Sequence, residues 1–542
     1  MDLGGASSLD HDVVTQLLLS RGVASEEIER HRNPTLRAFL PDPSEFRDMD
    51  AAAERLAQAV LTQETITIYG DYDVDGATSA ALLIRLLRAL GHEARYYIPD
   101  RLLEGYGPSG EALVRIAGEG SSLIVTVDCG AMAHQALDMA HQAGVDVVVV
   151  DHHKCAAELP RAAALVNPNR LDESDAAAAH GHLAAVGVAF LLAIATVRVL
   201  RERGHFQDRA EPDLFALLDL VALGTVADVA ALHGLNRAFV AQGLKIMARR
   251  EGVGMAALID ASRLSRAPTC SDLGFALGPR INAGGRVGEA TLGVRLLTTE
   301  DPDEAREIAA QLSRLNEERR AIEAAVQEMA EAQIDAQHNR AVLTLAGRGW
   351  HPGVIGIVAG RLAEKHHRPV ILVAFDEVAE RPGVGSARSV RGLNLYEALT
   401  ACANHLVSHG GHAAAAGLKI EERSVEDFRA SFCEYVAETL SAEQRVAELR
   451  IDAETPLSAL TYATVAQIES MAPFGHCNPR PLLCASGVRL KEPPKKIGGG
   501  GRHLSLVVEQ HGVRLRGVAF GAGDQADALA ACTELLDIAY RP

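Results

Sequence analysis

The chain has 542 residues, and 48% of them are apolar, which is enough for several domains with hydrophobic cores of their own. Its 71 acidic and 53 basic residues give a formal charge of −18, which argues against indiscriminate binding to nucleic acid or to an anionic membrane. We find no signal peptide, and the longest apolar run, residues 183–197, falls short of the roughly 20 residues of a membrane helix. The eight cysteines form no C-x-x-C pair, so we expect reduced thiols in a cytoplasmic protein.

Helical and strand patterns alternate between residues 51 and 150. Helices are expected at 51–61, 77–90, 109–117 and 131–142, and strands at 65–69, 93–98, 123–127 and 145–150. The run Val147–Val150 is apolar at every position, as is typical of a strand whose sheet is covered on both faces. These features predict an α/β fold, a doubly wound domain with a mostly parallel sheet.

Composition and periodicity divide the chain into five regions. They are an N-terminal helical extension at 1–50, the doubly wound domain at 51–230, a helical region at 231–337, a second, smaller α/β domain at 338–432 and an all-β domain at 440–542. The helical region ends in a long helix, expected from Pro302 to about Gln337, that connects the two α/β domains. Its apolar residues form a narrow seam on a charged rod: Ile308, Leu312, Leu315, Ile322, Val326 and Met329.

Acidic and imidazole side chains follow three of the expected strands. They are Asp71, Asp73 and Asp75 after the strand at 65–69, Asp128 after 123–127, and Asp151, His152 and His153 after 145–150. Because binding sites in such sheets form at the carboxyl ends of the strands, we expect these side chains to gather at one edge. Three carboxylates within five residues repel one another, and divalent cations relieve that repulsion. The sequence therefore predicts a binuclear metal centre.

Carboxylate ligands favour Mg²⁺ or Mn²⁺, and a histidine ligand shifts the preference toward Mn²⁺. Zinc on Cys129 or Cys155 is poorly supported, since neither has a thiolate partner at ligand spacing. Two such ions activate a water and clamp the oxygens of a phosphoryl group, so no side-chain nucleophile is needed. The plainer alternative is that these aspartates and histidines only cap helices. For Asp228, a lone acid in an apolar segment, the roles of ligand and helix cap stay open.

Arginines and a glycine-rich loop are candidate anion binders. Arg280 and Arg286 flank a glycine pair, and Arg388 precedes the loop at 410–417. Guanidinium groups grip phosphates, and glycine-rich turns expose backbone N–H groups. Taken singly, each arginine is more simply a surface residue.

A basic loop at 487–503 stands out in the acidic chain. Its basic residues are Arg489, Lys491, Lys495, Lys496 and Arg502, against one acid, Glu492. On a β domain such a loop suggests a groove that follows a single nucleic-acid strand. A solvated loop without a ligand accounts for the same charges equally well.

Several segments resemble one known family. IYGDYDVDG, VTVDCG, VDHHK and GTVADVAAL are similar to four successive motifs of the DHH phosphoesterase superfamily. GWHPGVIGIVAGRL, GSARS and GGHAAAAG are similar to its DHHA1 partner domain. Their order and spacing, with the segment SMAPFGHCNPRPLL and the short strands after it, resemble the RecJ family, which ends in an OB-fold β-barrel. The likeness extends from about residue 51 over most of the chain.

The resemblance implies a single-stranded-DNA-specific exonuclease that works from the 5′ end, releases mononucleotides, uses two Mn²⁺ or Mg²⁺ ions and acts in DNA repair and recombination. It implies metal ligands at Asp73, Asp75, Asp128, His152 and Asp228, with Asp71 and His153 as catalytic neighbours. It implies contacts to the 5′ end of the substrate from Arg101, Arg280, Ser386, Arg388, Gly410, Gly411 and His412. The implied partners are single-stranded DNA, a single-strand-binding protein and a helicase; the charge of the basic loop makes Lys491, Lys495, Lys496 and Arg502 the candidate contacts to the DNA.

Three other activities share parts of this pattern. A phosphodiesterase for short oligonucleotides or cyclic dinucleotides would have the same metal centre, but a short substrate needs neither the long helix nor the basic loop. A pyrophosphatase would leave the second half of the chain without a purpose. A non-catalytic strand-binding repair factor would be expected to have lost a metal ligand, and every motif residue is present.

Overall fold

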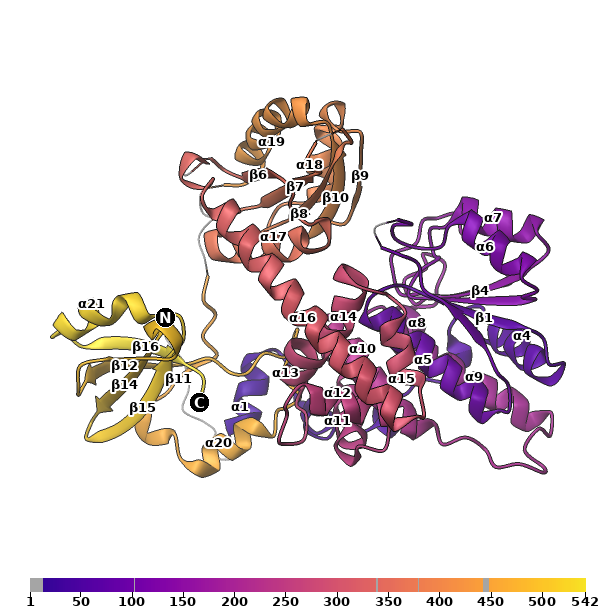
Figure 1. Ribbon diagram of the computed structural model, residues 1–542. Helices are drawn as coiled ribbons and strands as arrows, with labels where there is room; N and C mark the ends of the chain where they lie inside the picture. The colour runs from indigo at the N-terminus through magenta and orange to yellow at the C-terminus, as the bar shows by residue number, and fades with distance from the viewer. Residues whose placement is uncertain (1–12, 102, 338–339, 379, 442–447) are drawn as a thin grey trace. The chain divides into compact units, whose positions relative to one another are not determined.

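The computed structural model describes residues 13–101, 103–337, 340–378, 380–441 and 448–542 (Figure 1). The chain forms two compact units. One comprises Pro41–Ala230 and Gly243–Glu448, and the other comprises Met1–Leu40, Ala231–Gln242 and Leu449–Pro542. Among the described residues, no helix combines the length and the apolar content needed to cross a lipid bilayer.

The first sheet, predicted to be mostly parallel, is parallel throughout. Its strands are β1 (Ile66–Gly70), β2 (Arg95–Tyr97), β3 (Leu123–Val127), β4 (Asp146–Val150) and β5 (Ala164–Val166), in the order β2-β1-β3-β4-β5. One face is covered by α6 (Gly110–Gly118) and α7 (His134–Gln142), and the other by α4 (Met49–Leu61), α5 (Val74–Ala89) and α9 (Ala185–Glu202) (Figure 1). Every residue of β1 and of β3 is buried, which explains their apolar sequences. The doubly wound fold is confirmed, and β5 is an additional strand that was not predicted from the sequence.

The helix after β1 begins earlier than the predicted residue 77. Asp73 is its N-cap residue, and the Asp73 carboxylate accepts hydrogen bonds from the N–H groups of Asp75 (2.9 Å) and Gly76 (3.2 Å). Such a cap satisfies backbone donors that the first turn of a helix leaves free. As a result, Val74 and Asp75 lie inside α5 rather than before it.

A helical region follows the first sheet. It contains α10 (Leu218–Ala227), α11 (Gly234–Arg249), α12 (Val253–Ala261), α14 (Gly278–Val287), α15 (Leu292–Thr298) and the long α16 (Pro302–Glu331). The helix α16 buries Ile308, Leu312 and Val326 as predicted, but Met329 is 46% exposed, so its place on the seam was wrong. The middle of the buried stripe is polar instead, and it consists of Asn316, Arg319 and Glu323.

The second α/β domain has a mixed sheet. Its strands are β6 (Leu343–Arg348), β7 (Val370–Phe375), β8 (Gly383–Arg388), β9 (Ser408–Gly411) and β10 (Ala415–Ile420), in the order β6-β7-β8-β10-β9. Only β6 and β7 run parallel; the other pairs are antiparallel. One face packs against α17 (Pro352–His366) and the end of α16, and the other against α18 (Leu395–Ala401) and α19 (Val425–Thr439).

The C-terminal region is a six-stranded sheet. It consists of β11 (Ala453–Glu454), β12 (Leu483–Leu490), β13 (Lys495–Ile497), β14 (His503–Gln510), β15 (Val513–Ala519) and β16 (Leu536–Tyr540). The antiparallel pairs β12–β14, β13–β14, β14–β15 and β12–β16 fit the expected OB-type domain, and within the described residues the pairings form no closed ring. The N-terminal helix α1 (Val13–Ser20) packs here, against α20 (Tyr462–Glu469) and Leu483.

Candidate metal centre

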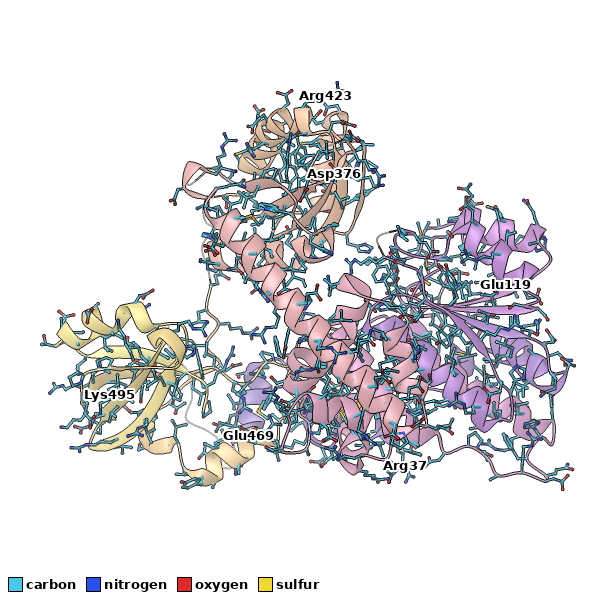
Figure 2. The ribbon with its side chains drawn as sticks, viewed as in Figure 1. Arg37, Glu119, Asp376, Arg423, Glu469 and Lys495 are labelled. Atoms are coloured by element: carbon cyan, nitrogen blue, oxygen red, sulfur yellow. The ribbon has the colours of Figure 1, made fainter. Side chains whose placement is uncertain are left out.

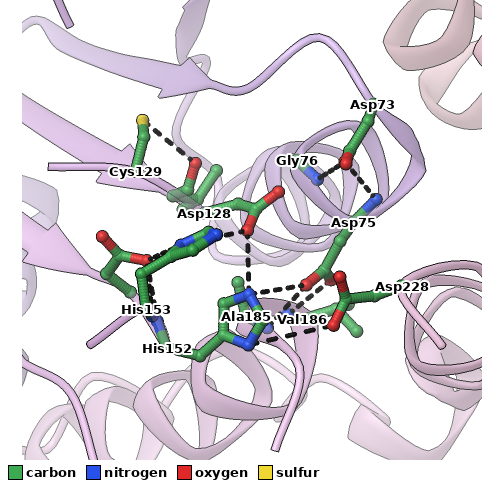
Figure 3. A network of polar contacts seen from close by, with 12 residues as sticks. Asp73, Asp75, Gly76, Asp128, Cys129, His152, His153, Ala185, Val186 and Asp228 are labelled. Carbon is green, nitrogen blue, oxygen red and sulfur yellow. Dashed lines mark hydrogen bonds and ion pairs between the residues drawn. The ribbon is translucent and has the colours of Figure 1, made fainter. Parts of the chain in front are cut away.

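The turn between β1 and α5 brings three aspartates together. Asp71 and Asp75 are buried and Asp73 is half-buried. The turn is tight enough that a Cβ on Gly76 would lie 2.4 Å from the Asp71 carbonyl oxygen, so only glycine fits there. Both oxygens of the Asp75 carboxylate accept backbone hydrogen bonds at the start of α9, from Ala185 N (2.7 Å) and Val186 N (2.9 Å) (Figure 3).

Asp128 follows β3 directly and points into the same space (Figure 3). Its backbone has φ = 61°, a left-handed conformation that is uncommon for residues other than glycine and that often marks functional sites. The side chain is buried, and its Oδ1 lies 3.3 Å from His152 Nε2.

The two histidines after β4 are each oriented by a second group. His152 Nδ1 donates to the Leu183 carbonyl oxygen (3.0 Å), which leaves Nε2 unprotonated and facing Asp128. His153 Nδ1 donates to Asp151 Oδ1 (2.8 Å). Asp151 therefore acts as an orienting carboxylate, a role that the sequence pattern alone did not assign to it.

Asp228 reaches the cluster from the C-terminal end of α10. It occupies the C-cap position, and its Oδ2 lies 3.9 Å from His152 Nδ1. The sequence left open whether Asp228 is a ligand or a helix cap, and the structure shows features of both. A helix end positions the residue, and its carboxylate joins the cluster (Figure 3).

These side chains form three overlapping groups whose potential ligand atoms lie within 4.8 Å of one another. The groups are Asp128, His152 and His153; Asp75, His152 and Asp228; and Asp71, Asp73 and Asp128. Two buried atoms in them, Asp71 Oδ1 and His152 Nε2, have no hydrogen-bond partner among the described residues. Buried polar atoms without partners are rare, and a bound cation would satisfy both. The residues thus fit a divalent metal ion.

The electrostatics of the cluster favour the same conclusion. Burial, and then the charge of Asp73, raise the pKa of Asp75 to about 7. Burial, and then the charges of Asp75 and Asp73, raise the pKa of Asp228 to about 9. The pKa values of Asp71 and Asp128 are also raised well above normal, by burial and then by Asp73. Carboxylates that crowd in this way retain their charges at neutral pH when cations bind among them.

The two histidines have opposite pKa shifts. Burial, and then the neighbouring His153, lower the pKa of His152 to about 4, so its ring is neutral and able to bind a metal. Burial would also lower the pKa of His153, but the hydrogen bond and charge of Asp151 outweigh it and raise the pKa to about 9. Burial would raise the pKa of Asp151, but the hydrogen bond and charge of His153, together with the charge of His152 and the Ala131 N–H, lower it to about 2.

The second α/β domain contributes to the same place. The His412 ring is stacked 6.4 Å from the His153 ring, which brings the loop containing Gly410 and Gly411 to the cluster. Tyr106 is a further neighbour that the sequence reading missed: its hydroxyl donates to the Asp128 carbonyl (3.2 Å) and lies 3.0 Å from His153 Nδ1. The only signal for Tyr106 was an aromatic residue between two glycines in a loop without periodicity.

Three arginines lie close together beside this cluster. Arg101 stacks on the Tyr72 ring at 4.8 Å, and its charge adds to burial in lowering the pKa of both Arg286, to about 10, and Arg388. Arg388 Nη1 donates to Ser386 Oγ (3.1 Å). Arginines that depress one another's pKa in this way are a favourable setting for an anion.

Arg280 has different surroundings. Its Nε donates to Ser313 Oγ on α16 (3.1 Å), and the charges that act on it are those of Glu317, Arg320 and Arg263. In the same sequence segment, it is Arg286 whose pKa is lowered by the charge of Arg101. Its Nη1 donates to the Gly353 carbonyl at the start of α17 (3.0 Å).

The basic residues of the C-terminal sheet are partly paired. Lys491 Nζ lies 3.4 Å from Glu509, and Lys495 Nζ lies 3.7 Å from Glu492. Lys495 is exposed on β13 (Figure 2), Lys496 is exposed beside it, and Arg502 Nε donates to the Gly499 carbonyl (3.2 Å). Exposed ion pairs of this kind contribute little stability, so these cations can exchange their partners for phosphates.

Comparison with known proteins gives consistent matches. Three family models match the chain: DHH family, N-terminal domain, at residues 65–225; DHHA1 domain, at 338–438; and RecJ OB domain, at 451–542. The single-stranded-DNA-specific exonuclease RecJ of Dickeya dadantii (strain 3937) is 41% identical over 525 residues, which are 94% of this chain and 89% of that protein. The protein of the same name from Bacillus subtilis (strain 168) is 36% identical over 521 residues, which are 95% of this chain and 64% of that protein.

A solved structure matches along almost the whole chain. It is the crystal structure of RecJ in complex with Mn²⁺ from Thermus thermophilus, with a TM-score of 0.80 and 32% sequence identity. The match covers 97% of this chain and 72% of that one. The chain thus spans about two thirds to nine tenths of the length of these relatives.

Proposed function

This chain belongs to the RecJ family, and on that premise we propose that it is a metal-dependent exonuclease that degrades single-stranded DNA from the 5′ end. The proposed products are 5′-mononucleotides, and the proposed setting is DNA repair and recombination in the cytoplasm. One observation carries the proposal: residues from three strand ends and a helix end converge on one cluster, and His412 of the second domain stacks beside it.

The proposed metal ligands are the residues that the motifs imply. They are Asp73, Asp75, Asp128, His152 and Asp228, for two Mn²⁺ or Mg²⁺ ions. When bound, such ions supply Lewis acidity to the scissile phosphate and to the attacking water. The chain's own part is to hold the ligands: α9 fixes Asp75 by two N–H groups, and the Leu183 carbonyl fixes the ring of His152.

Asp71 and His153 are proposed as catalytic residues next to the reacting phosphate. Asp71 presents a buried carboxylate oxygen without a hydrogen-bond partner among the described residues. His153 is held in place by Asp151 and has the Tyr106 hydroxyl 3.0 Å from its ring. Both residues can therefore contact a group that enters between the two domains of this unit without first moving.

The proposed holder of the 5′ end is the arginine group together with the glycine-rich loop. Arg101, Arg388 and Ser386 were implied by the resemblance. Arg286 joins them because the charge of Arg101 lowers its pKa, as it lowers that of Arg388. The proposed contacts to the terminal nucleotide come from Gly410, Gly411 and His412. Arg280 stays in the proposed set on the resemblance alone, because its own bonds tie it to α16.

The C-terminal sheet is proposed to bind the strand further along. The proposed contacts are Lys491, Lys495, Lys496 and Arg502, which lie on or beside β12–β14. We also propose a single-strand-binding protein and a helicase as partners, which co-purification from a cell that expresses a tagged chain would test.

A substrate panel tests the proposal. Purified protein with Mn²⁺ is incubated with 5′-labelled and 3′-labelled single strands, duplex DNA, a dinucleotide and pyrophosphate. We expect mononucleotides from the single strand, with the 5′ label released first, and none from the duplex. Asp75→Ala serves as the inactive control. Turnover of the dinucleotide or of pyrophosphate alone would refute the exonuclease assignment.

A further inference from the structure

Two asparagines lie behind the histidine pair of the candidate metal centre. They follow β5 in the segment Asn167-Pro168-Asn169. Asn167 is fully buried, and its Nδ2 donates to the His153 carbonyl oxygen (2.7 Å). Asn169 is half-buried, and its Nδ2 donates to the His152 carbonyl oxygen (2.6 Å). Two consecutive carbonyl groups of the histidine pair are thus held by two side chains of one short segment.

The same asparagines connect the histidine pair to the start of α9. Asn169 Nδ2 also donates to the Gly181 carbonyl oxygen (3.0 Å), and Asn169 N donates to Asn167 Oδ1 (2.8 Å). Gly181 lies two residues before Leu183, whose carbonyl fixes the ring of His152. The Asn169 side chain is therefore bonded both to the backbone of His152 and to the segment that carries the acceptor of its ring proton.

The fit between Asn169 and Gly181 is close. A Cβ on Gly181 would lie 2.6 Å from Asn169 Oδ1, so a larger residue at position 181 would displace the Asn169 side chain. This contact offers a way to disturb the bonds of Asn169 while leaving residue 169 itself unchanged.

We infer that Asn167 and Asn169 are positioning residues of the metal centre, which hold the backbone of His152 and His153 so that His152 Nε2 points at the carboxylates. The inference rests on the proposed function, because it concerns the ions of that centre. Groups behind a metal ligand commonly set its orientation, and their loss weakens metal binding by about 10-fold to 100-fold. An amide is suited to the task, since it donates to two carbonyl oxygens at once and carries no charge that would compete for the ion.

The overlap of the three ligand groups makes the inference selective. His152 belongs to two of them, whereas the group of Asp71, Asp73 and Asp128 contains no histidine. Loss of the Asn169 bonds should therefore weaken the ion that uses His152 and leave the ion that uses only aspartates largely unaffected. If the segment Asn167–Asn169 only stabilised the fold, its disruption would weaken the binding of both ions equally.

The test is a Mn²⁺ titration of the full chain, with free Mn²⁺ measured by electron paramagnetic resonance. We compare Asn169→Ala, Asn167→Ala and Gly181→Ala with the unchanged protein. We expect one of two classes of bound Mn²⁺ to weaken by about 10-fold to 100-fold. With a single-stranded oligonucleotide, kcat should fall at low Mn²⁺ and recover at high Mn²⁺, while KM for the oligonucleotide stays within about twofold.

Asn478 provides a matched control in the other unit of the chain. It is also buried, and its Nδ2 also donates to two carbonyl oxygens, those of Met471 (3.2 Å) and Pro473 (2.7 Å). Asn478→Ala should lower the melting temperature and leave both Mn²⁺ affinities unchanged. Weaker Mn²⁺ binding in this variant would mean that general loosening explains the effect, and it would overturn the inference.

Two further outcomes would also overturn it: unchanged Mn²⁺ affinity in Asn169→Ala, and equal weakening of both classes of ion. If Asn167→Ala fails to fold, the half-buried Asn169→Ala and the milder Asn169→Ser decide the matter. The unchanged protein separates this inference from its premise. If that protein binds no Mn²⁺ at all, the proposed function fails, whatever the variants do.

Discussion

The unit that comprises Pro41–Ala230 and Gly243–Glu448 contains two buried clusters of charge, and they are built in opposite ways. In the middle of α16, Arg319 donates to Asn316 Oδ1 (2.8 Å) and to Glu323, and Glu323 also pairs with Arg361 of α17 (2.8 Å). At the edge of the first sheet, carboxylates face carboxylates around the neutral ring of His152, and the cation among them, His153, is paired with Asp151. Both clusters are desolvated, but the second has too little counter-charge: its cation, His153, is bonded to Asp151, and the pKa values of Asp71, Asp75, Asp128 and Asp228 stay raised. Burial of charge therefore does not identify a functional site, whereas buried carboxylates in excess of their counter-charges do.

The largest expected effect comes from removing a charge at the cluster with excess carboxylates. Asp128→Asn keeps the shape of the side chain and lowers its negative charge. We expect kcat on single-stranded DNA to fall by about a thousandfold, since several kcal/mol of transition-state stabilisation depend on the bound ions. In urea, the metal-free variant should be at least as stable as the metal-free parent, because a repelling charge is gone. Activity near that of the parent, or a clear loss of metal-free stability, would mean that the charge of Asp128 is not an excess charge of a metal centre.

The next effect concerns the compensated cluster. Glu323→Gln leaves Arg319 buried without its counter-charge, so the free energy of unfolding should fall by about 3–5 kcal/mol, measured by urea denaturation. Glu331→Gln on the same helix is the matched control, because the Glu331–Lys365 pair (2.7 Å) lies at the surface, with Lys365 exposed and Glu331 half-buried. That variant should lose at most about 1 kcal/mol. Equal losses of unfolding free energy in Glu323→Gln and Glu331→Gln would mean that burial does not determine what an ion pair contributes to stability.

The stabilisation of the protein by metal ions should depend on the carboxylates at the edge of the first sheet and not on the charged cluster of α16. Mn²⁺ at about 100 times its dissociation constant should stabilise the unchanged protein by about 2.7 kcal/mol, and EDTA should reverse this. Glu323→Gln should keep the full response to Mn²⁺, and Asp128→Asn should lose most of it. Differential scanning calorimetry with and without Mn²⁺ measures both. A response in Asp128→Asn as large as in the parent would place the ions elsewhere.

The smallest effect is expected on the exposed C-terminal sheet. Lys495→Ala should weaken binding of a long single strand modestly and reduce the slope of log K against log salt by about 0.7, measured by fluorescence anisotropy. Turnover of a dinucleotide should not change. Arg423→Ala removes an exposed cation from the second α/β domain and should leave the slope unchanged. If Lys495→Ala also leaves the salt slope unchanged, Lys495 does not contact phosphate.

Much of the metal centre could be predicted because its ligands follow their strands immediately in the sequence. Asp128, His152 and His153 each lie within three residues of a strand end, so a correct strand assignment places them. Tyr106 and Asn169 could not be found in this way, since a loop and a three-residue strand, β5, carry no periodic signal. The seam of α16 was partly misjudged for a related reason. A search for apolar residues passes over Arg319 and Glu323, which become core residues only because each supplies the other's counter-charge.

The start of α9 has a consequence for how ions enter and leave the centre. Its first two N–H groups hold both oxygens of Asp75 through bonds that involve no cation. This carboxylate therefore keeps its orientation when the ion beside it departs, and no side-chain rotation at Asp75 has to precede rebinding. Exchange of Mg²⁺ for Mn²⁺ should accordingly proceed without a conformational lag, at a rate set by ion dehydration and diffusion.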